Sequence, residues 1–157
     1  MESESPCRTR LPHAVPQWVA ERSWFFITIN CVPRATNQLC REGIGAAVLA
    51  AAAYNHDKLV WYCRLCLLMP DHLHAIIAFP RDPGMAIVIA NWKKFVAVKM
   101  EINWQRNFFD HRLRSPDEVV EKTSYILQNP VRKGLCKRAE DWPWVFRPDD
   151  RPPPKLG

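Results

Sequence analysis

The sequence lacks any apolar segment long enough to cross a membrane. Its longest apolar run, from Ile44 to Tyr54, falls well short of the roughly 20 residues that a transmembrane helix needs. The polar start, MESESPCRTR, lacks the apolar core of a secretory signal. Internal repeats and an interdomain linker are also missing. We therefore expect a soluble, intracellular protein that has no membrane partner.

The composition excludes a mainly disordered chain. With 157 residues, of which 48% are hydrophobic and 11% aromatic, the chain is long and apolar enough to build one core, but not two. Prolines cluster before the first apolar segment and after the last one, as is typical of extended tails. The sequence thus predicts an N-terminal tail over residues 1–22, one domain over residues 23–147 and a proline-rich tail over residues 148–157.

The charge of the chain is concentrated in its second half. Lysine and arginine exceed aspartate and glutamate by 22 to 16, and the sequence pI is about 9.2, in the range of nucleic-acid binders. The stretch from Asn91 to Arg138 holds eleven basic and five acidic residues, so it carries the whole excess. Because this stretch is not one amphipathic helix, it favours nucleic acid over a membrane surface as the partner. A solvated basic surface is the alternative.

The six cysteines, at positions 7, 31, 40, 63, 66 and 136, resemble a metal or disulfide framework at first sight. Cys63 and Cys66 even have the CxxC spacing of zinc sites. The surrounding KLVWYCRLCLLM is typical of a strand, in which residues three apart point to opposite faces. We therefore expect no shared metal, and buried free thiols in a reducing compartment.

Hydrophobic periodicity predicts four strands and three helices. The strands are expected at 24–30, 58–69, 72–79 and 108–113, and the helices at 43–55, 85–104 and 116–128. A turn at Pro70 and Asp71 joins the middle strands into an antiparallel hairpin. Ser115, Pro116 and Glu118 form a complete helix start with a capping box. This order predicts an α+β fold with helices on one face of an antiparallel sheet.

Two histidines stand on the otherwise apolar strand within MPDHLHAII. On a strand, His72 and His74 share one face about 7 Å apart at the backbone, while Leu73, Ala75 and Ile77 face the helices. Two imidazoles at this spacing could bind one cation. The alternative is that both only form hydrogen bonds on an exposed sheet face.

A tyrosine and an asparagine follow near the end of the last predicted helix. Tyr125 and Asn129 stand four residues apart, which makes them surface neighbours roughly 5–6 Å apart on a helix. Each also has a structural interpretation, because a tyrosine there often packs half-buried and an asparagine before proline often ends a helix.

Together these motifs resemble a known family. The His-Leu-His motif and the stretch NFFDHRLRSPDEVVEKTSYILQNPVRKGL resemble the REP-associated tyrosine transposases, bacterial proteins of the single-tyrosine HUH endonuclease and insertion-sequence transposase superfamily. The resemblance runs from about Trp24 to Phe146 and includes a Trp-Pro-Trp near the end. It implies a ferredoxin-like, or RRM-like, four-stranded antiparallel sheet with helices on one face, and a C-terminal helix that carries the tyrosine.

The resemblance also implies a chemistry. His72 and His74 become metal ligands, Asn129 a third ligand through its amide oxygen, and Tyr125 the nucleophile. The expected cofactor is Mg²⁺ or Mn²⁺. The implied activity is cleavage and rejoining of single-stranded DNA at hairpins through a covalent 5′-phosphotyrosine, in DNA transposition or REP-element processing. The partners are single-stranded DNA and DNA hairpins, and we expect a cytoplasmic monomer or homodimer.

Several further residues are candidates for contacts with the DNA. His111 lies in the segment before the tyrosine helix, where it could orient a catalytic group, contact phosphate or hold a structural hydrogen bond. Trp142 and Trp144 could stack on unpaired bases or pack over the core. The basic candidates are Arg112, Arg114, Arg132, Lys133, Lys93 and Lys94.

Two other functions fit the same residues. One is a non-catalytic module of the same fold that binds single-stranded nucleic acid. The other is a metallohydrolase in which the two histidines and a water act without a covalent step. Both predict that Tyr125→Phe is tolerated, whereas only the hydrolase loses activity when its metal is chelated.

Overall fold

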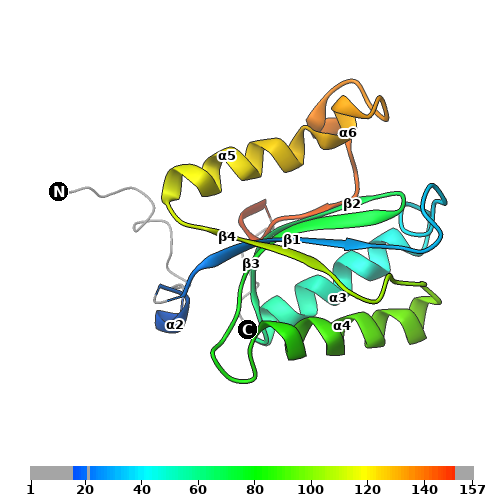
Figure 1. The fold of residues 1–157 in the computed structure, drawn as a ribbon. Coiled ribbons are helices and arrows are strands. Elements are labelled where there is room, and N and C mark those ends of the chain that lie inside the picture. The colour runs from blue at the N-terminus through cyan, green and yellow to red at the C-terminus, as the bar shows by residue number, and fades with distance from the viewer. Residues whose placement is uncertain (1–15, 21, 151–157) are drawn as a thin grey trace, which may run out of the picture.

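The computed structural model describes residues 16–20 and 22–150 and shows an α+β fold around one antiparallel sheet (Figure 1). The strand order is β4-β1-β3-β2-β5. This confirms the predicted class, but the sheet has five strands instead of four, because a short last strand pairs with β2. The strands are β1 Trp24–Asn30, β2 Tyr62–Met69, β3 His72–Ala78, β4 Phe109–Leu113 and β5 Val145–Phe146.

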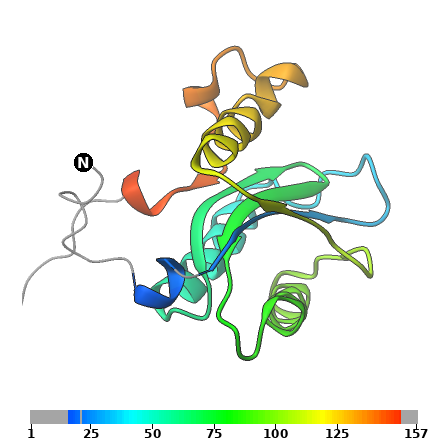
Figure 2. The ribbon, with the colours of Figure 1, turned by 60° about the vertical axis from the view of Figure 1, so that its left-hand side comes forward.

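Helices cover both faces of this sheet (Figure 2). Helices α3 (Gly45–Asp57) and α4 (Met85–Met100) lie on one face, as predicted for the first two helices. Helix α5 (Pro116–Leu127) crosses the other face and is followed directly by the short α6 (Asn129–Arg132). The remaining short helices are α2 Gln17–Ala20, η1 Ala139–Asp141 and η2 Pro148–Asp150.

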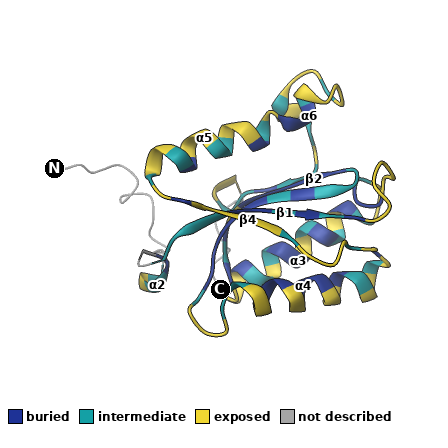
Figure 3. Ribbon diagram, viewed as in Figure 1, coloured by how far each residue is buried: buried dark blue, intermediate teal, exposed yellow. Residues whose placement is uncertain are grey.

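The central strand β3 is buried on both sides, so its side chains point alternately into two separate cores. Leu73, Ala75 and Ile77 pack into the core under α3 and α4, as predicted. On the opposite face, Ile76 joins a smaller core with the inner side chains of α5. Figure 3 shows the outer surface of α5 exposed and the central strands buried. The face under α5 is therefore the one that also receives the two histidines of β3.

A bulge in β2 overturns the expected orientation of the CxxC pair. The pairing register with β3 shifts between Cys63 and Leu65, and an extra residue reverses the alternation of side chains beyond it. Cys63 and Cys66 consequently lie in the same core under α3 and α4. Both are free thiols, and burial raises the pKa of Cys66 to about 12. The expectation that the two thiols point to opposite faces is therefore wrong, because the bulge turns both into one core.

Among the other cysteines of the described residues, Cys31 is a buried free thiol, whereas Cys40 and Cys136 are free but only partly buried. The prediction of buried thiols is thus wrong for Cys40 and Cys136, which lie in connecting segments outside the strands. Cys7 lies outside the described residues.

Left-handed backbone positions explain where two predicted elements are shorter than expected. Glu101 has a φ of 58°, so α4 ends at Met100 and does not reach residue 104. Leu59 has a φ of 60°, and β2 begins only at Tyr62. Residues other than glycine rarely adopt this left-handed backbone conformation, and hydrophobic periodicity alone does not reveal where it occurs.

Parts of the two predicted tails are ordered against the domain. Val19 of α2 is buried, and Arg22 Nε donates to the carbonyl of Phe79 at 2.9 Å. The first residues of the predicted C-terminal tail form η2. The rest of both tails, residues 1–15 and 151–157, lies outside the described residues. Within the described part of the chain, no helix is both long and apolar enough to span a membrane.

Helix α5 depends on its N-terminal cap. The Ser115 hydroxyl accepts a hydrogen bond from the Glu118 amide at 3.1 Å, and the Glu118 carboxylate accepts one from the Arg114 amide. Ser115→Ala should lower the free energy of unfolding by about 1 kcal/mol, since it leaves an amide of the first turn without a partner. Urea unfolding followed by circular dichroism measures this change.

The matched control is Ser124→Ala, at an exposed position of the same helix. Because alanine favours helix slightly more than serine, this variant should be as stable as the parent chain or slightly more so. Equal stability of the two variants would contradict the assignment of the cap.

Candidate active site

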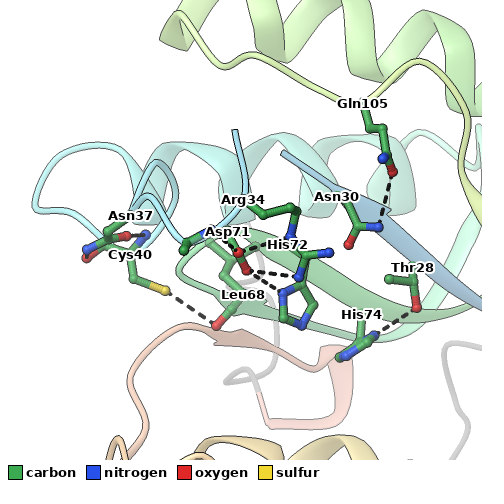
Figure 4. Close-up of polar contacts among 11 residues, drawn as sticks. Thr28, Asn30, Arg34, Asn37, Cys40, Leu68, Asp71, His72, His74 and Gln105 are labelled. Atoms are coloured by element: carbon green, nitrogen blue, oxygen red, sulfur yellow. Dashed lines mark hydrogen bonds and ion pairs between the residues drawn. The ribbon is translucent and has the colours of Figure 1, made fainter. Parts of the chain in front are cut away.

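Strand β3 brings the two predicted histidines together on the face of the sheet under α5. The His72 and His74 ring centroids are 4.7 Å apart and the rings are inclined at 75° (Figure 4). Their positions two residues apart on one strand explain the shared face. The pair is thus covered by α5 and α6 and separated from α3 and α4 by the sheet itself.

A carboxylate orients the first imidazole. His72 Nδ1 lies 2.8 Å from Asp71 Oδ1, and the other carboxylate oxygen accepts from Arg34 Nε at 3.0 Å and from the Ala35 amide at 2.7 Å. Although burial opposes the shift, these bonds hold the pKa of Asp71 well below its ordinary value. An ionised carboxylate only accepts, so Nδ1 of His72 carries a proton and the lone pair is on Nε2.

A hydroxyl holds the second imidazole. His74 Nδ1 lies 2.9 Å from Thr28 Oγ1, and the ring stacks on Phe26 with centroids 5.3 Å apart. Burial, the neighbouring His72 imidazole and the positive charges of Lys122 and Arg132 lower the pKa of His74 to about 3. Burial also lowers the pKa of His72, despite the nearby carboxylate. Both imidazoles are therefore neutral at neutral pH.

The donor chemistry of this pair fits a divalent metal. A neutral imidazole binds metal through one nitrogen while the other is held by a hydrogen bond, and both Nδ1 atoms are held here. The described residues contain no group of three or more histidine, cysteine, aspartate or glutamate side chains that could hold a metal. The remaining ligands would have to be amide oxygens, water or phosphate oxygens, which suit Mg²⁺ and Mn²⁺.

Tyr125 stands on α5 between two cations. Its side chain is half exposed, with Arg132 Cζ 4.0 Å and Lys122 Nζ 4.9 Å from the ring centroid. The same Lys122 ammonium lies 4.5 Å from the ring centroid of Phe26, the ring on which His74 stacks. Lys122 therefore connects the tyrosine helix to Phe26 of β1, the strand that pairs with β3.

Asn129 belongs to the tyrosine side of this arrangement. Its side chain is 4% exposed, and its Oδ1 accepts a hydrogen bond from Arg132 Nη2 at 3.1 Å. The same nitrogen donates to the carbonyl of Tyr125 at 2.9 Å. Asn129 thus fixes the guanidinium that covers the phenol. Because an amide oxygen has two lone pairs, accepting this bond leaves one for the predicted role as a third ligand.

The basic candidates divide between the two faces of the sheet. Lys133 lies close enough to His72 for its charge to lower the pKa of that imidazole, and Arg112 and Arg114 are exposed at the end of β4. Lys94 is exposed on α4, across the sheet from the histidines.

The prediction that Lys93 contacts DNA is wrong, because its side chain is buried on α4. Its ammonium donates to the carbonyls of Gln105 and Arg106 at 2.8 and 2.9 Å. Lys93 has a structural role at this position, since its charge is not available to a phosphate. Sequence pattern alone does not separate such a lysine from a surface cation.

The structure also shows the surroundings of the predicted accessory residues, one histidine and two tryptophans. His111 is exposed on β4, where it pairs with Phe26 and lines a groove with Tyr125. Trp142 donates from Nε1 to the carbonyl of Leu68 at 2.9 Å and packs on the core under α5. Trp144 packs on the core under α3 and α4. Both tryptophans therefore follow the packing interpretation.

The sequence analysis did not assign functional roles to Thr28, Arg34, Asp71 or Lys122. Lys122 could have been found, because it stands one helical turn before Tyr125. Asp71 was assigned only to the turn, although it directly precedes His72. Thr28 and Arg34 come from β1 and the loop after it, so only the pairing of β1 with β3 brings them to the imidazoles.

Comparisons with known proteins find similar proteins both by fold and by sequence. No family model matches the chain. A solved structure, described as "Structure of the REP associates tyrosine transposase bound to a REP hairpin", superposes with a TM-score of 0.67 over 78% of this chain and 75% of that one. At 24% sequence identity, this likeness shows a shared fold. The chain is thus similar in fold to a transposase.

Two curated relatives carry the name of one family. The REP-associated tyrosine transposase of Escherichia coli K12 is 30% identical over 83 residues, which cover 50% of this chain and 49% of that protein. A Haemophilus influenzae protein named "Putative REP-associated tyrosine transposase" is 30% identical over 97 residues, covering 51% and 54%. The chain spans about half the length of these relatives. The predicted resemblance to REP-associated tyrosine transposases is confirmed.

The guanidinium of Arg132 offers a test of the geometry around Tyr125. Arg132→Ala should lower the free energy of unfolding by about 1 kcal/mol, because it leaves the buried Asn129 amide oxygen without its donor. Thermal and urea unfolding measure this loss. Lys133→Ala removes the same charge at an exposed neighbouring position and should change stability by less than about 0.5 kcal/mol. Equal effects of both variants would refute the contact.

Proposed function

We propose that this protein is a metal-dependent endonuclease and strand transferase for single-stranded DNA, with Tyr125 as its nucleophile. The observation that carries the proposal is the position of Lys122, whose ammonium lies against both the Tyr125 ring and the Phe26 ring on which His74 stacks. A nucleophile, a pair of metal-type donors and two cations thus meet between the helix and the sheet. This combination is what phosphodiester cleavage by a tyrosine requires.

His72 and His74 would hold the metal through their Nε2 atoms, because their Nδ1 atoms are held by Asp71 and Thr28. A bound Mg²⁺ or Mn²⁺ supplies charge that offsets the negative charge developing on the phosphate. Burial keeps both imidazoles neutral without loss of their orientation. Lys122 and Arg132 attract the phosphate to the phenol by their own charge.

The proposed reaction exchanges one phosphoester bond for another. The phenolic oxygen of Tyr125 forms a bond to phosphorus while the bond to the 3′ oxygen breaks, and that oxygen leaves with a proton as a 3′-hydroxyl. The 5′ strand end stays on the tyrosine as a phosphodiester. A 3′-hydroxyl of another strand can then attack the same phosphorus and release the tyrosine. Because the number of phosphoester bonds is unchanged, rejoining needs no ATP.

The relatives indicate the substrate and the scaffold of this reaction. The solved relative is bound to a REP hairpin, so we propose hairpin DNA as the partner and DNA transposition or REP-element processing as the role. The order β1-α3-β2-β3-α4-β4 with β1 and β3 at the centre supports a ferredoxin-like core, to which β5 adds an edge and α5 a second layer.

The first test of the function is the covalent intermediate. Wild-type protein, incubated with 5′- and 3′-labelled single-stranded hairpin oligonucleotides and Mn²⁺, should give a protein–DNA band on a denaturing gel. Tyr125→Phe should abolish this band, because its ring has no oxygen to form the phosphotyrosine. Tyr54→Phe is the matched control, since Tyr54 is exposed on α3, across the sheet. It should retain the full adduct.

Other outcomes of this experiment would overturn the proposal. Metal-dependent cutting that persists in Tyr125→Phe would assign the protein to hydrolases without a covalent step. Binding of every hairpin without cutting by the wild type would assign it to non-catalytic nucleic-acid-binding modules.

The second test concerns the metal and uses binding alone. Asp71→Asn should weaken Mn²⁺ binding by about 10- to 100-fold, because it removes the carboxylate that orients His72. Titration followed by the electron paramagnetic resonance of free Mn²⁺ measures the affinity. His72→Ala combined with His74→Ala should abolish binding. Asp110→Asn, an exposed β4 residue, removes the same charge elsewhere, and a loss of the same size in this variant would refute the assigned role.

A further inference from the structure

A groove of about 340 Å³ lies beside Tyr125, between the edge strand β4 and helix α5. Its size falls within the roughly 300–1,000 Å³ that small-molecule sites occupy. The helical residues in it stand three and four positions apart, so they form one stripe of α5. The lining residues are His111, Leu113, Glu118, Glu121, Lys122 and Tyr125. A group that enters the groove therefore lies next to the phenol.

The groove carries two acidic side chains within an otherwise basic part of the chain. The basic stretch from 91 to 138 has only five acidic residues, and Glu118 and Glu121 of these line the groove. The Glu118 carboxylate caps the start of α5. Glu121 is exposed, and its carboxylate has no hydrogen bond or ion pair with any other residue that the structure describes.

A free carboxylate at this place selects against one part of a nucleic acid and for another. It repels phosphate oxygens, which Lys122 and Arg132 attract at Tyr125. It accepts hydrogen bonds from N–H donors, and two neighbouring donors can bind its two oxygens at once. The groove is thus suited to a base and not to the backbone.

We propose that this groove binds an unpaired guanine next to the phosphate at Tyr125, and that Glu121 determines this specificity. Guanine presents two adjacent donors on its Watson–Crick edge, N1–H and the N2 amine. Adenine and cytosine place an acceptor beside their donor, and thymine places its donor between two acceptors. Only guanine therefore satisfies both carboxylate oxygens without repulsion. The inference rests on the proposed function, because it requires single-stranded DNA as the substrate.

The walls of the groove suit a planar base as well. His111 on β4 lines it and is exposed, so it offers a ring face on which an unpaired base can stack. Leu113 adds an apolar contact to the lining. Recognition of unpaired bases commonly combines such stacking with hydrogen bonds to the Watson–Crick edge.

The test measures binding without chemistry. Fluorescently labelled oligo-dT carrying one central dG, one deoxyinosine or one 7-deazaguanine is titrated with full-length protein in EDTA, and all-dT is the reference. Wild type should bind the dG oligonucleotide about tenfold more tightly than all-dT. Inosine lacks the N2 amine and should lose most of this preference. 7-Deazaguanine keeps the Watson–Crick edge and should retain it.

Two variants identify the residue responsible. Glu121→Gln keeps the size of the side chain but removes its charge and one acceptor, so the dG preference should fall below about threefold while binding to all-dT is unchanged or tighter. Asp117→Asn removes a charge from the same helix outside the groove and should keep the full preference. An unchanged preference in Glu121→Gln, an equal loss in Asp117→Asn, or no binding of either oligonucleotide by wild type would overturn the proposal.

The covalent-adduct experiment with Tyr125→Phe separates this proposal from the proposed function. Guanine preference without an adduct would leave the groove as a binding site and overturn the strand-transfer chemistry. An adduct without guanine preference would leave the chemistry and overturn the groove.

Discussion

The structure depends on the burial of β3 on both of its faces. Strands β1 and β2 pair with it on either side, and helices cover it above and below. A strand in this position must place apolar residues toward both cores or compensate every polar one. Toward α3 and α4 it is wholly apolar, whereas toward α5 it carries His72 and His74. Their hydrogen bonds to Asp71 and Thr28 offset the cost of removing two imidazoles from water.

Because the two histidines are neutral, positively charged side chains can lie close to them. Lys122 and Arg132 sit close enough to depress the pKa of His74, and a protonated pair would repel both. With neutral imidazoles, the cations gather at the Tyr125 ring, where a phosphate would meet them. The Asp71 carboxylate, which also contacts His72, forms an ion pair with Arg34. The site therefore separates the cations around Tyr125 from the neutral imidazole pair.

Alternation and capping were the two patterns that the sequence expressed reliably. The strand positions of Leu73, Ala75 and Ile77 and the cap at Ser115 agree with the structure, because each depends on local geometry. The CxxC pair shows a feature that local alternation does not predict. One bulged residue in β2 puts Cys63 and Cys66 on the same side, and no periodicity announces an insertion of that kind. Lys93 illustrates the same limit, since its acceptors are carbonyls more than ten residues away.

The sequence by itself determined the α+β class and the histidine pair on one strand face, since neighbours along a strand have nearly constant geometry. Tertiary structure alone decided what surrounds them. The hydroxyl beside His74 and the Phe26 ring beside Lys122 come from elements far along the chain from the residues that they contact. Their contacts depend on how layers pack, and packing is set by the whole core and not by any local pattern.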